Sequence, residues 1–240
     1  MAQRLQLLLL SLPLLSAAPQ PLPHLLPAAS ATWHGRTLSP SPTNVSFSWE
    51  GVSARFTVTG GTTVVLNATS GCPGSALFHT LIDGALHSNW TLTKGGLVDF
   101  VVAEGLDPGV RHEVVLWYAT DPISLSWDRL PFWLHTFNGF SSDGVLSPTP
   151  PSSRRLLIIG DSISAGNQIS NATCGDDHWG SYGARLCEHF GADCQTAAVS
   201  GKGLYVSSSV ASLSPPTAPA LNISPNSFTP ANRPTVATMM

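Results

Sequence analysis

Short segments rich in β-branched and aromatic residues follow one another through much of the first 140 residues, with glycines between them and no helical periodicity. Strands at such close spacing are typical of antiparallel domains, because tight turns leave no room for crossover helices. We therefore expect an antiparallel, jelly-roll-like β-sandwich over residues 31–140. The segments that predict its strands are residues 45–50, 54–60, 62–69, 76–84, 90–93, 97–103, 112–120 and 130–137.

The pattern changes after residues 141–153, where clustered serine and proline predict a linker. Residues 156–159 form a continuous apolar run, which is typical of a strand buried on both faces of a parallel sheet. Residues 178–191 have helical spacing and end in Gly191, a favourable C-cap, and residues 194–201 predict the next strand. Residues 154–205 therefore predict the start of an α/β domain.

Both ends of the chain differ from these two domains. Arg4 precedes the apolar run 5–15, and small residues follow at 16–18, so residues 1–18 predict a secretory signal peptide and an extracellular protein. The run is too short to span a bilayer, although a membrane anchor remains the alternative. Residues 19–30 predict a flexible lead-in, and residues 206–240, rich in Ser, Pro, Ala and Thr, predict a disordered or O-glycosylated tail.

Composition restricts the class of partner. The net charge is −3 and the chain has only two lysines, so no basic stripe is available for nucleic acid. Charged residues make up 10% of the chain, against about 25% in ordinary soluble domains, so Ser, Thr, Asn and attached glycans must provide most of the polar groups at the surface. Candidate N-glycosylation sites lie at Asn44, Asn67, Asn89, Asn171 and Asn222; chance explains some such triplets, and we expect about two or three to be used.

Four cysteines fit an oxidising compartment, and their spacing matches no metal or redox motif. Cys72 is far in sequence from Cys174, Cys187 and Cys194. We expect one bridge among the latter three, with Cys72 free or joined to the remaining one.

Gly160, Asp161 and Ser162 follow directly after the apolar run 156–159. A strand-to-helix turn presents a serine at the edge of a sheet, close to backbone N–H groups that stabilise an oxyanion. Taken alone, the triplet fits an ordinary turn or an Asp161 helix cap better.

The wider sequence resembles the SGNH (GDSL-type) hydrolases, which have a flavodoxin-like α/β fold. "LLIIGDSISAGNQ" is similar to their first sequence block and "AAVSGKGL" to their second. The resemblance implies that Ser162 is the nucleophile, that Ser162 and Gly201 donate backbone N–H groups to the oxyanion, and that Gly160 and Asp161 support the turn.

The first half resembles the β-sandwich of carbohydrate esterase family two, through "GRTL", "FSWEGVSARFTVTGGTTVVL", "GLDPGVRHEVVLWYATD" and "TFNGFSSDGVLSP". This resemblance spans about residues 33–205. It implies a secreted esterase that removes acetyl groups from polysaccharides or glycosides through an acyl-enzyme. The alternative is a non-catalytic secreted glycan-binding or cell-wall protein.

Two family blocks do not follow Gly201: the G-x-N-D block and the late block with the histidine base. His178 and His189 follow the serine too closely to match that base, and we expect both to be solvated helix residues. We therefore expect a truncated or mis-spliced form of a longer esterase, with impaired catalysis.

The other histidines and the tryptophans predict no cofactor site. His79 and His135 lie in strand patterns and are expected to be partly buried, and no histidine spacing indicates a metal or cofactor. We expect Trp179 to face the substrate. The tryptophans expected in the core of the sandwich are Trp49, Trp90, Trp117, Trp127 and Trp133.

Overall fold

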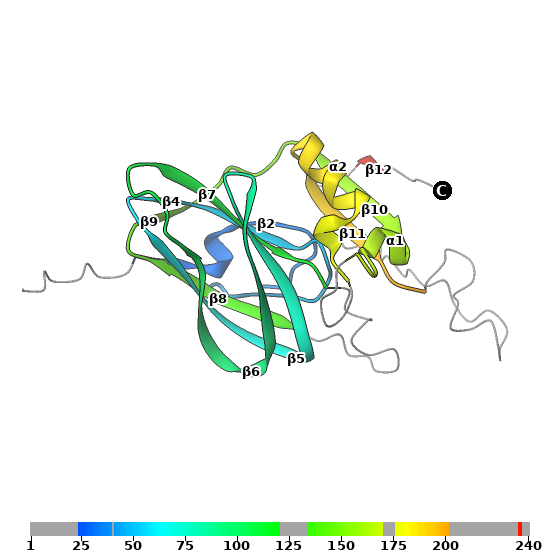
Figure 1. Ribbon diagram of the computed structural model, residues 1–240, viewed down its shortest axis with the longest axis horizontal. Helices are drawn as coiled ribbons and strands as arrows, with labels where there is room; N and C mark the ends of the chain where they lie inside the picture. Colours follow the sequence, from blue (N-terminus) through cyan, green and yellow to red (C-terminus); the bar gives the residue numbers. More distant parts are fainter. Residues whose placement is uncertain (1–23, 40, 121–133, 170–175, 202–234, 237–240) are drawn as a thin grey trace, which may run out of the picture.

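A computed structural model describes residues 24–39, 41–120, 134–169, 176–201 and 235–236. The described chain forms two parts that lie side by side (Figure 1). The first, here called the β-domain, comprises the described residues between 24 and 148, and the second, the C-terminal unit, comprises those between 155 and 201 with the short strand 235–236. The predicted signal peptide, residues 1–18, lies outside the described residues, as do Asn171, Cys174, Asn222, Trp127 and Trp133.

The β-domain is one antiparallel sheet that contains nine strands within the described residues. The strand order is β1-β8-β5-β7-β4-β2, with β3 on β8, β6 on β5 and β9 on β4. The antiparallel prediction is confirmed, but the strands form a single curled sheet and not two separate sheets. The strands are β1 (His24–Pro27), β2 (Thr32–His34), β3 (Val45–Phe47), β4 (Ser53–Thr59), β5 (Thr63–Ile82), β6 (Ala85–Glu104), β7 (Arg111–Tyr118), β8 (His135–Ser142) and β9 (Val145–Pro148).

The length of β5 makes the sheet curl. Its first part pairs with β8 from Val64 to Ser70, and its last part pairs with β7 from Phe78 to Ile82, while β6 follows it along its whole length. Register shifts lie around Ser70, where the sequence predicted a break between two strands. A bulge bends a strand without ending it, so the glycines here turn the sheet instead of terminating it.

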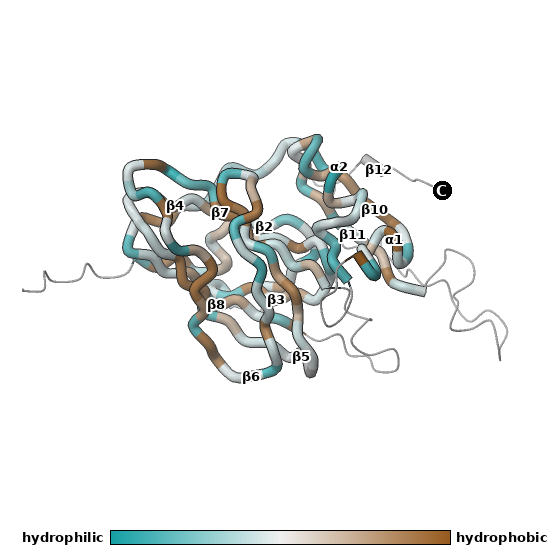
Figure 2. The backbone as a smooth tube through the Cα atoms, viewed as in Figure 1, coloured by the Kyte–Doolittle hydropathy of each residue, from teal (hydrophilic) through white to brown (hydrophobic). Residues whose placement is uncertain are grey.

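Period-two alternation in the sequence builds the core of the β-domain. In β4, Ala54, Phe56 and Val58 are fully buried, whereas the intervening Arg55 is partly exposed. Aromatic rings meet inside the curl: Phe47 lies edge-on to Phe137, with ring centroids 5.0 Å apart. In Figure 2, brown segments accordingly lie among paler and teal ones along the strands.

Three expected flexible segments contain strands. In the expected lead-in, β1 pairs with β8 and buries Leu26, and it continues into a short 3-10 helix, Ala28–Ser30. In the expected linker, β9 pairs with β4. In the expected tail, β12 (Thr235–Val236) pairs with β10. Each segment gains backbone hydrogen bonds from a neighbouring strand distant in sequence, which a local pattern does not show.

The C-terminal unit has a parallel sheet of order β11-β10-β12 among the described residues. Its elements are β10 (Arg155–Gly160), α1 (Ser162–Ala165), a 3-10 helix (His178–Gly180), α2 (Tyr182–Phe190) and β11 (Asp193–Ala198). The strand predicted at 156–159 and the helix end at Gly191, which has φ +54°, are confirmed. Cys187 and Cys194 form the disulfide, one of the pairings expected.

The two parts share a second apolar cluster, here called the junction. Strands β5 and β7 have one face in the β-domain core and the other against the C-terminal unit. The buried junction residues are Leu77, Leu81, Val115, Trp117 and Ala119 from the β-domain and Ile158, Trp179, Ala184, Cys187, Ala192 and Cys194 from the C-terminal unit.

Candidate active site

The turn after β10 is closely packed because Gly160 has no side chain. A Cβ atom at residue 160 would overlap the hydroxyl oxygen of Ser164 and lie 2.5 Å from its Cβ. The Ser164 hydroxyl in turn shares a hydrogen bond of 2.7 Å with the Tyr182 hydroxyl of α2. The backbone beneath Ser162 is therefore held between β10 and α2.

Hydrogen bonds fix both ends of α1, whose first residue is Ser162. The Asp161 carboxylate accepts a hydrogen bond from the backbone N–H of Ile163 at 3.1 Å, which satisfies one of the helix's first N–H groups. At the other end, Gly166 has φ +83°, where a Cβ would overlap the Asp177 carbonyl oxygen. Ser162 is partly exposed, and its neighbour Ile163 is 71% exposed, so this turn lies at the surface.

The parallel pairing of β10 and β11 brings Gly201 to the same edge as Ser162. Gly160 pairs with Ala198, so the chain leaves both strands at one edge of the sheet. The Val199 N–H donates to the Gly160 carbonyl at 3.4 Å, which continues the contact beyond the strands. Gly201 has φ +76°, a conformation that favours glycine.

A buried carboxylate from the β-domain also contacts this edge. Glu50 follows β3, is 1% exposed, and accepts a hydrogen bond from the Ala198 N–H at 3.3 Å. Burial lowers the pKa of Arg36, and the nearby charge on Glu50 opposes this shift only in part. The sequence did not predict a role for Glu50 at this edge. The available signal was an acidic residue at the end of an apolar strand pattern.

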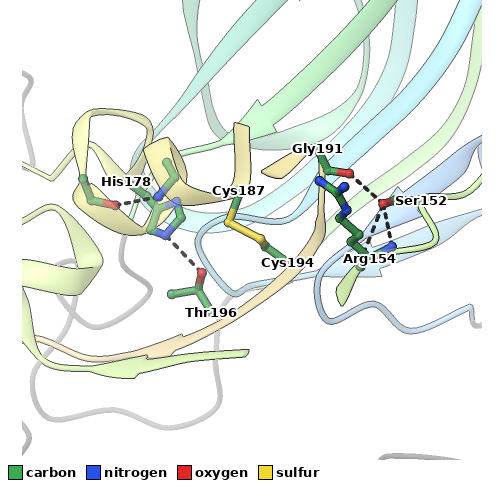
Figure 3. Close-up of a disulfide and its surroundings, with 9 residues drawn as sticks. Ser152, Arg154, His178, Cys187, Gly191, Cys194 and Thr196 are labelled. Atoms are coloured by element: carbon green, nitrogen blue, oxygen red, sulfur yellow. Dashed lines mark hydrogen bonds between the residues drawn. A yellow bond between two sulfur atoms is a disulfide. The ribbon is translucent and has the colours of Figure 1, made fainter. Parts of the chain in front are cut away.

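His178 is a buried residue of the junction and not the solvated helix residue that the sequence predicted. Its ring stacks on Trp117, with ring centroids 5.7 Å apart. Its Nε2 shares a hydrogen bond of 3.1 Å with the Thr196 hydroxyl, which Figure 3 shows. Burial lowers the pKa of His178 to about 4, against a smaller opposing influence of Asp177. His189 is exposed on α2, as expected.

Neither histidine can be assigned as the base from this geometry. Within the described residues, neither His178 nor His189 hydrogen-bonds to Ser162. His79 is fully engaged elsewhere: its Nε2 lies 2.7 Å from Asp177 and its Nδ1 lies 2.6 Å from the Asn89 side-chain oxygen. His135 is buried in the β-domain core, and burial lowers its pKa to about 4.

Trp179 is buried, which corrects the prediction, made from its place after the turn, that it faces the substrate. It is 7% exposed, lies edge-on to Trp117 at 5.3 Å and carries Arg185 over its ring at 4.4 Å. Trp90 and Trp117 are buried as expected, and Trp49 is half-buried beneath Arg36. The described tryptophans thus serve packing.

No group of three or more metal-ligating side chains lies together in the described parts of the chain. The structure also has no helix, among those it describes, with the length and apolar character needed to cross a membrane.

Comparison with known proteins identifies what the β-domain resembles. Residues 33–130 match the family described as "Carbohydrate esterase 2 N-terminal". No similar sequence was found among curated proteins. The match confirms the resemblance to carbohydrate esterase family two that the sequence indicated.

Solved structures of that family share the fold. A family two carbohydrate esterase from Clostridium thermocellum, in complex with cellohexaose, is 24% identical, with 73% of this chain and 53% of that chain covered and a TM-score of 0.63. An acetyl xylan esterase from Butyrivibrio proteoclasticus is 19% identical, with 77% and 51% covered and a TM-score of 0.64. A family 2 enzyme from Corynascus thermopiles is 26% identical, with 72% and 50% covered and a TM-score of 0.57. The chain spans about half the length of these proteins.

Proposed function

Because residues 33–130 match the N-terminal domain of carbohydrate esterase family two, we propose that the chain is a secreted serine esterase of acetylated carbohydrate. The proposal takes the C-terminal unit as part of an SGNH-type α/β domain. It takes residues 1–18 as a signal peptide that directs the chain out of the cell. The fold shared with an acetyl xylan esterase supports the choice of acetyl esters as substrates.

Ser162 carries the proposed chemistry. Its hydroxyl oxygen attacks the acetyl carbonyl carbon, the bond from that carbon to the sugar oxygen breaks, and the hydroxyl proton ends on the sugar oxygen. Water then hydrolyses the acetyl-serine, which releases acetic acid and restores the serine hydroxyl. Backbone N–H groups of Ser162 and Gly201 stabilise the oxyanion, since the strand register directs both turns to one edge. Gly160 and Asp161 keep the turn in place through the Ser164 and Ile163 contacts.

Catalysis by this chain is expected to be impaired. No hydrogen bond joins a histidine to Ser162 within the described residues, where His178 bonds to Thr196, and general-base assistance typically contributes about 10²–10⁴-fold. We therefore expect slow acyl transfer, supported by the oxyanion donors and binding alone.

The carrying observation is the placement of Ser162, partly exposed at the edge shared by β10 and β11. Its test is hydrolysis of 4-nitrophenyl acetate and acetylated xylan by the chain and by Ser162→Ala, with intact mass measured to detect an acetyl adduct of the protein. Ile163→Ala, one residue away and exposed, is the matched control. We expect the adduct and the rate above background to disappear only in Ser162→Ala; equal rates in all three proteins would contradict the proposal.

A non-catalytic glycan-binding protein is the second candidate, because no hydrogen bond joins a histidine to Ser162 within the described residues. Calorimetry of the chain with acetylated xylo-oligosaccharides distinguishes the two. Saturable binding without adduct or release of acetate supports the second candidate.

A further inference from the structure

The β-domain has a groove of about 450 Å³ that includes no residue of the C-terminal unit. Strands β1, β8, β5 and β6 lie side by side beneath it, and its lining includes Leu25, Asn67, Asp99 and Asn138. Grooves of roughly 300–1,000 Å³ are large enough to hold a small organic group.

Strand register explains the groove. Pro27 pairs with Gly139, Gly139 with Asn67, and Asn67 with Asp99, so the four residues form one row across the sheet. Gly139 contributes no side chain to this row, and a Cβ there would lie 3.1 Å from the Leu26 carbonyl oxygen, so the glycine lets β1 approach β8 closely. Apolar surface lies beside the row, since Leu25 is 76% exposed.

Asn67 is also the acceptor of an N-glycosylation triplet, completed by Ala68 and Thr69. Its side-chain nitrogen, Nδ2, donates to Asp99 Oδ1 at 2.7 Å. A primary amide has two N–H hydrogens, so Nδ2 keeps one donor after it forms a bond to a sugar. The contact with Asp99 is therefore compatible with glycosylation and would hold the linkage in one orientation.

We propose that Asn67 carries an N-linked oligosaccharide whose first N-acetylglucosamine lies in this groove. The apolar face of the sugar packs on Leu25 and Pro27, and its polar groups meet Asp99 and Asn138. The buried Nδ2 of Asn138 has no hydrogen-bond partner among the described residues and can donate to the sugar's acetamide oxygen.

The modification is a balanced group transfer from a lipid-linked oligosaccharide diphosphate. Asn67 Nδ2 attacks the anomeric carbon, loses one proton to the surrounding water and forms the N–C bond. The bond from that carbon to the diphosphate breaks, and its electron pair leaves with the lipid diphosphate. This inference rests on the secretory route of the proposed function and is independent of ester hydrolysis.

The other described triplets lie elsewhere. The Asn44 side chain accepts from the Ser41 hydroxyl at 2.7 Å, and Ser46 of the same triplet is buried. Asn89 is exposed on β6, where its oxygen contacts His79. Neither Asn44 nor Asn89 lines the groove, so the first sugar of a glycan at either residue would not lie in it.

The test uses the full chain secreted from eukaryotic cells. Peptide mass spectrometry after enzymatic release in ¹⁸O water shows whether Asn67 was modified, and Asn67→Gln and Thr69→Ala should both remove that signal while Thr69→Ser retains it. Peptide-N-glycosidase, which cuts the bond between asparagine and sugar, should act at least about tenfold more slowly on the native protein than on the unfolded one, because the groove must open first. An endoglycosidase that cuts beyond the first sugar should act equally on both.

A matched control carries an acceptor on an open surface. Lys94→Asn with Gly96→Thr creates a triplet on exposed residues, where a Cβ at residue 96 meets no atom within 4 Å. Peptide-N-glycosidase should remove a glycan at residue 94 rapidly from the folded protein. Leu25→Asp should accelerate release at Asn67. If the chain is found in the medium with Asn67 unmodified, the glycan at Asn67 is contradicted but the secretory route is not. If peptide-N-glycosidase acts on folded protein at Asn67 as fast as at the control site, the position of the glycan in the groove is contradicted. A chain retained in the cytosol with residues 1–18 intact contradicts the secretory route and, with it, the glycan.

Discussion

Individual residues that lack a side chain shape the candidate active site as much as those that carry chemistry. Gly160 leaves room for the Ser164 hydroxyl, which bonds Tyr182 of α2. The sequence identified Gly160, Asp161 and Ser162 because they are adjacent in a motif. It did not identify Ser164 with Tyr182, or Glu50 with Ala198, because those pairs meet only after the chain folds.

Gly160→Ala tests this packing. The added methyl group must displace Ser164, and overpacking of this kind typically costs about 1–3 kcal/mol, so we expect a lower free energy of unfolding in urea. Loss of the acetyl adduct at Ser162 should accompany it, because the turn moves. Gly96→Ala is the control, because a Cβ there meets no atom within 4 Å. If Gly160→Ala has the same free energy of unfolding as the unchanged protein, the turn can accommodate the methyl group and the packing argument is wrong.

At the level of elements, local patterns predicted strand positions better than strand ends. Runs of β-branched and aromatic residues placed β4 and β7 correctly, because such residues favour strands whether one face or both are buried. The same patterns divided β5 at its glycines, since a bulge and a turn share that composition. Strands β1 and β9 were missed because they depend on partners far along the chain.

The disulfide ties the buried face of α2 to the start of β11. Cys187 and Cys194 are separated by seven residues, and closing so short a loop restricts the unfolded chain by roughly 2–3 kcal/mol. We expect Cys187→Ala with Cys194→Ala to lower the free energy of unfolding by about that amount and to abolish the effect of a reductant on Tm. A reductant-sensitive Tm in the double variant would show that another bridge contributes.

On the scale of the whole molecule, the junction explains the two wrong predictions for His178 and Trp179. Both follow the candidate nucleophile in sequence, which suggested solvent or substrate as their surroundings. The structure instead packs both against Trp117 of β7. A signal was present in residues 112–120, whose apolar run lacks strict alternation and so indicates a strand covered on both faces.

Burial of His178 predicts acid sensitivity. Its pKa is about 4 in the folded chain and 6.5 when unfolded, so between these values the unfolded chain holds more protons. The stabilisation is therefore complete above pH 6.5 and is lost as the pH falls towards 4, at most by about 3 kcal/mol. Burial also lowers the pKa of His135 to about 4, so His135 adds to the loss of stability as the pH falls.

Urea unfolding at pH 7.5 and pH 5 checks this expectation. His178→Gln should reduce the loss of stability between the two pH values, whereas His189→Gln, an exposed control, should leave it unchanged. If all three proteins lose the same free energy of unfolding between pH 7.5 and pH 5, His178 is not the source of the acid sensitivity.

Trp117 is the central side chain of the junction. Trp117→Ala removes its contacts with His178 and Trp179 and should lower the free energy of unfolding by about 3–5 kcal/mol. Leu86→Ala, on a residue that is 52% exposed, should cost less than about 0.5 kcal/mol. If the two variants unfold at similar urea concentrations, the junction contributes little.

The doubly covered strand β7 has a practical consequence for expressing pieces of this protein. A recombinant fragment cut near residue 150 would carry an uncovered strip formed by Leu77, Leu81, Val115 and Trp117. Such a strip favours self-association, so the fragment should precipitate unless these positions are first made hydrophilic.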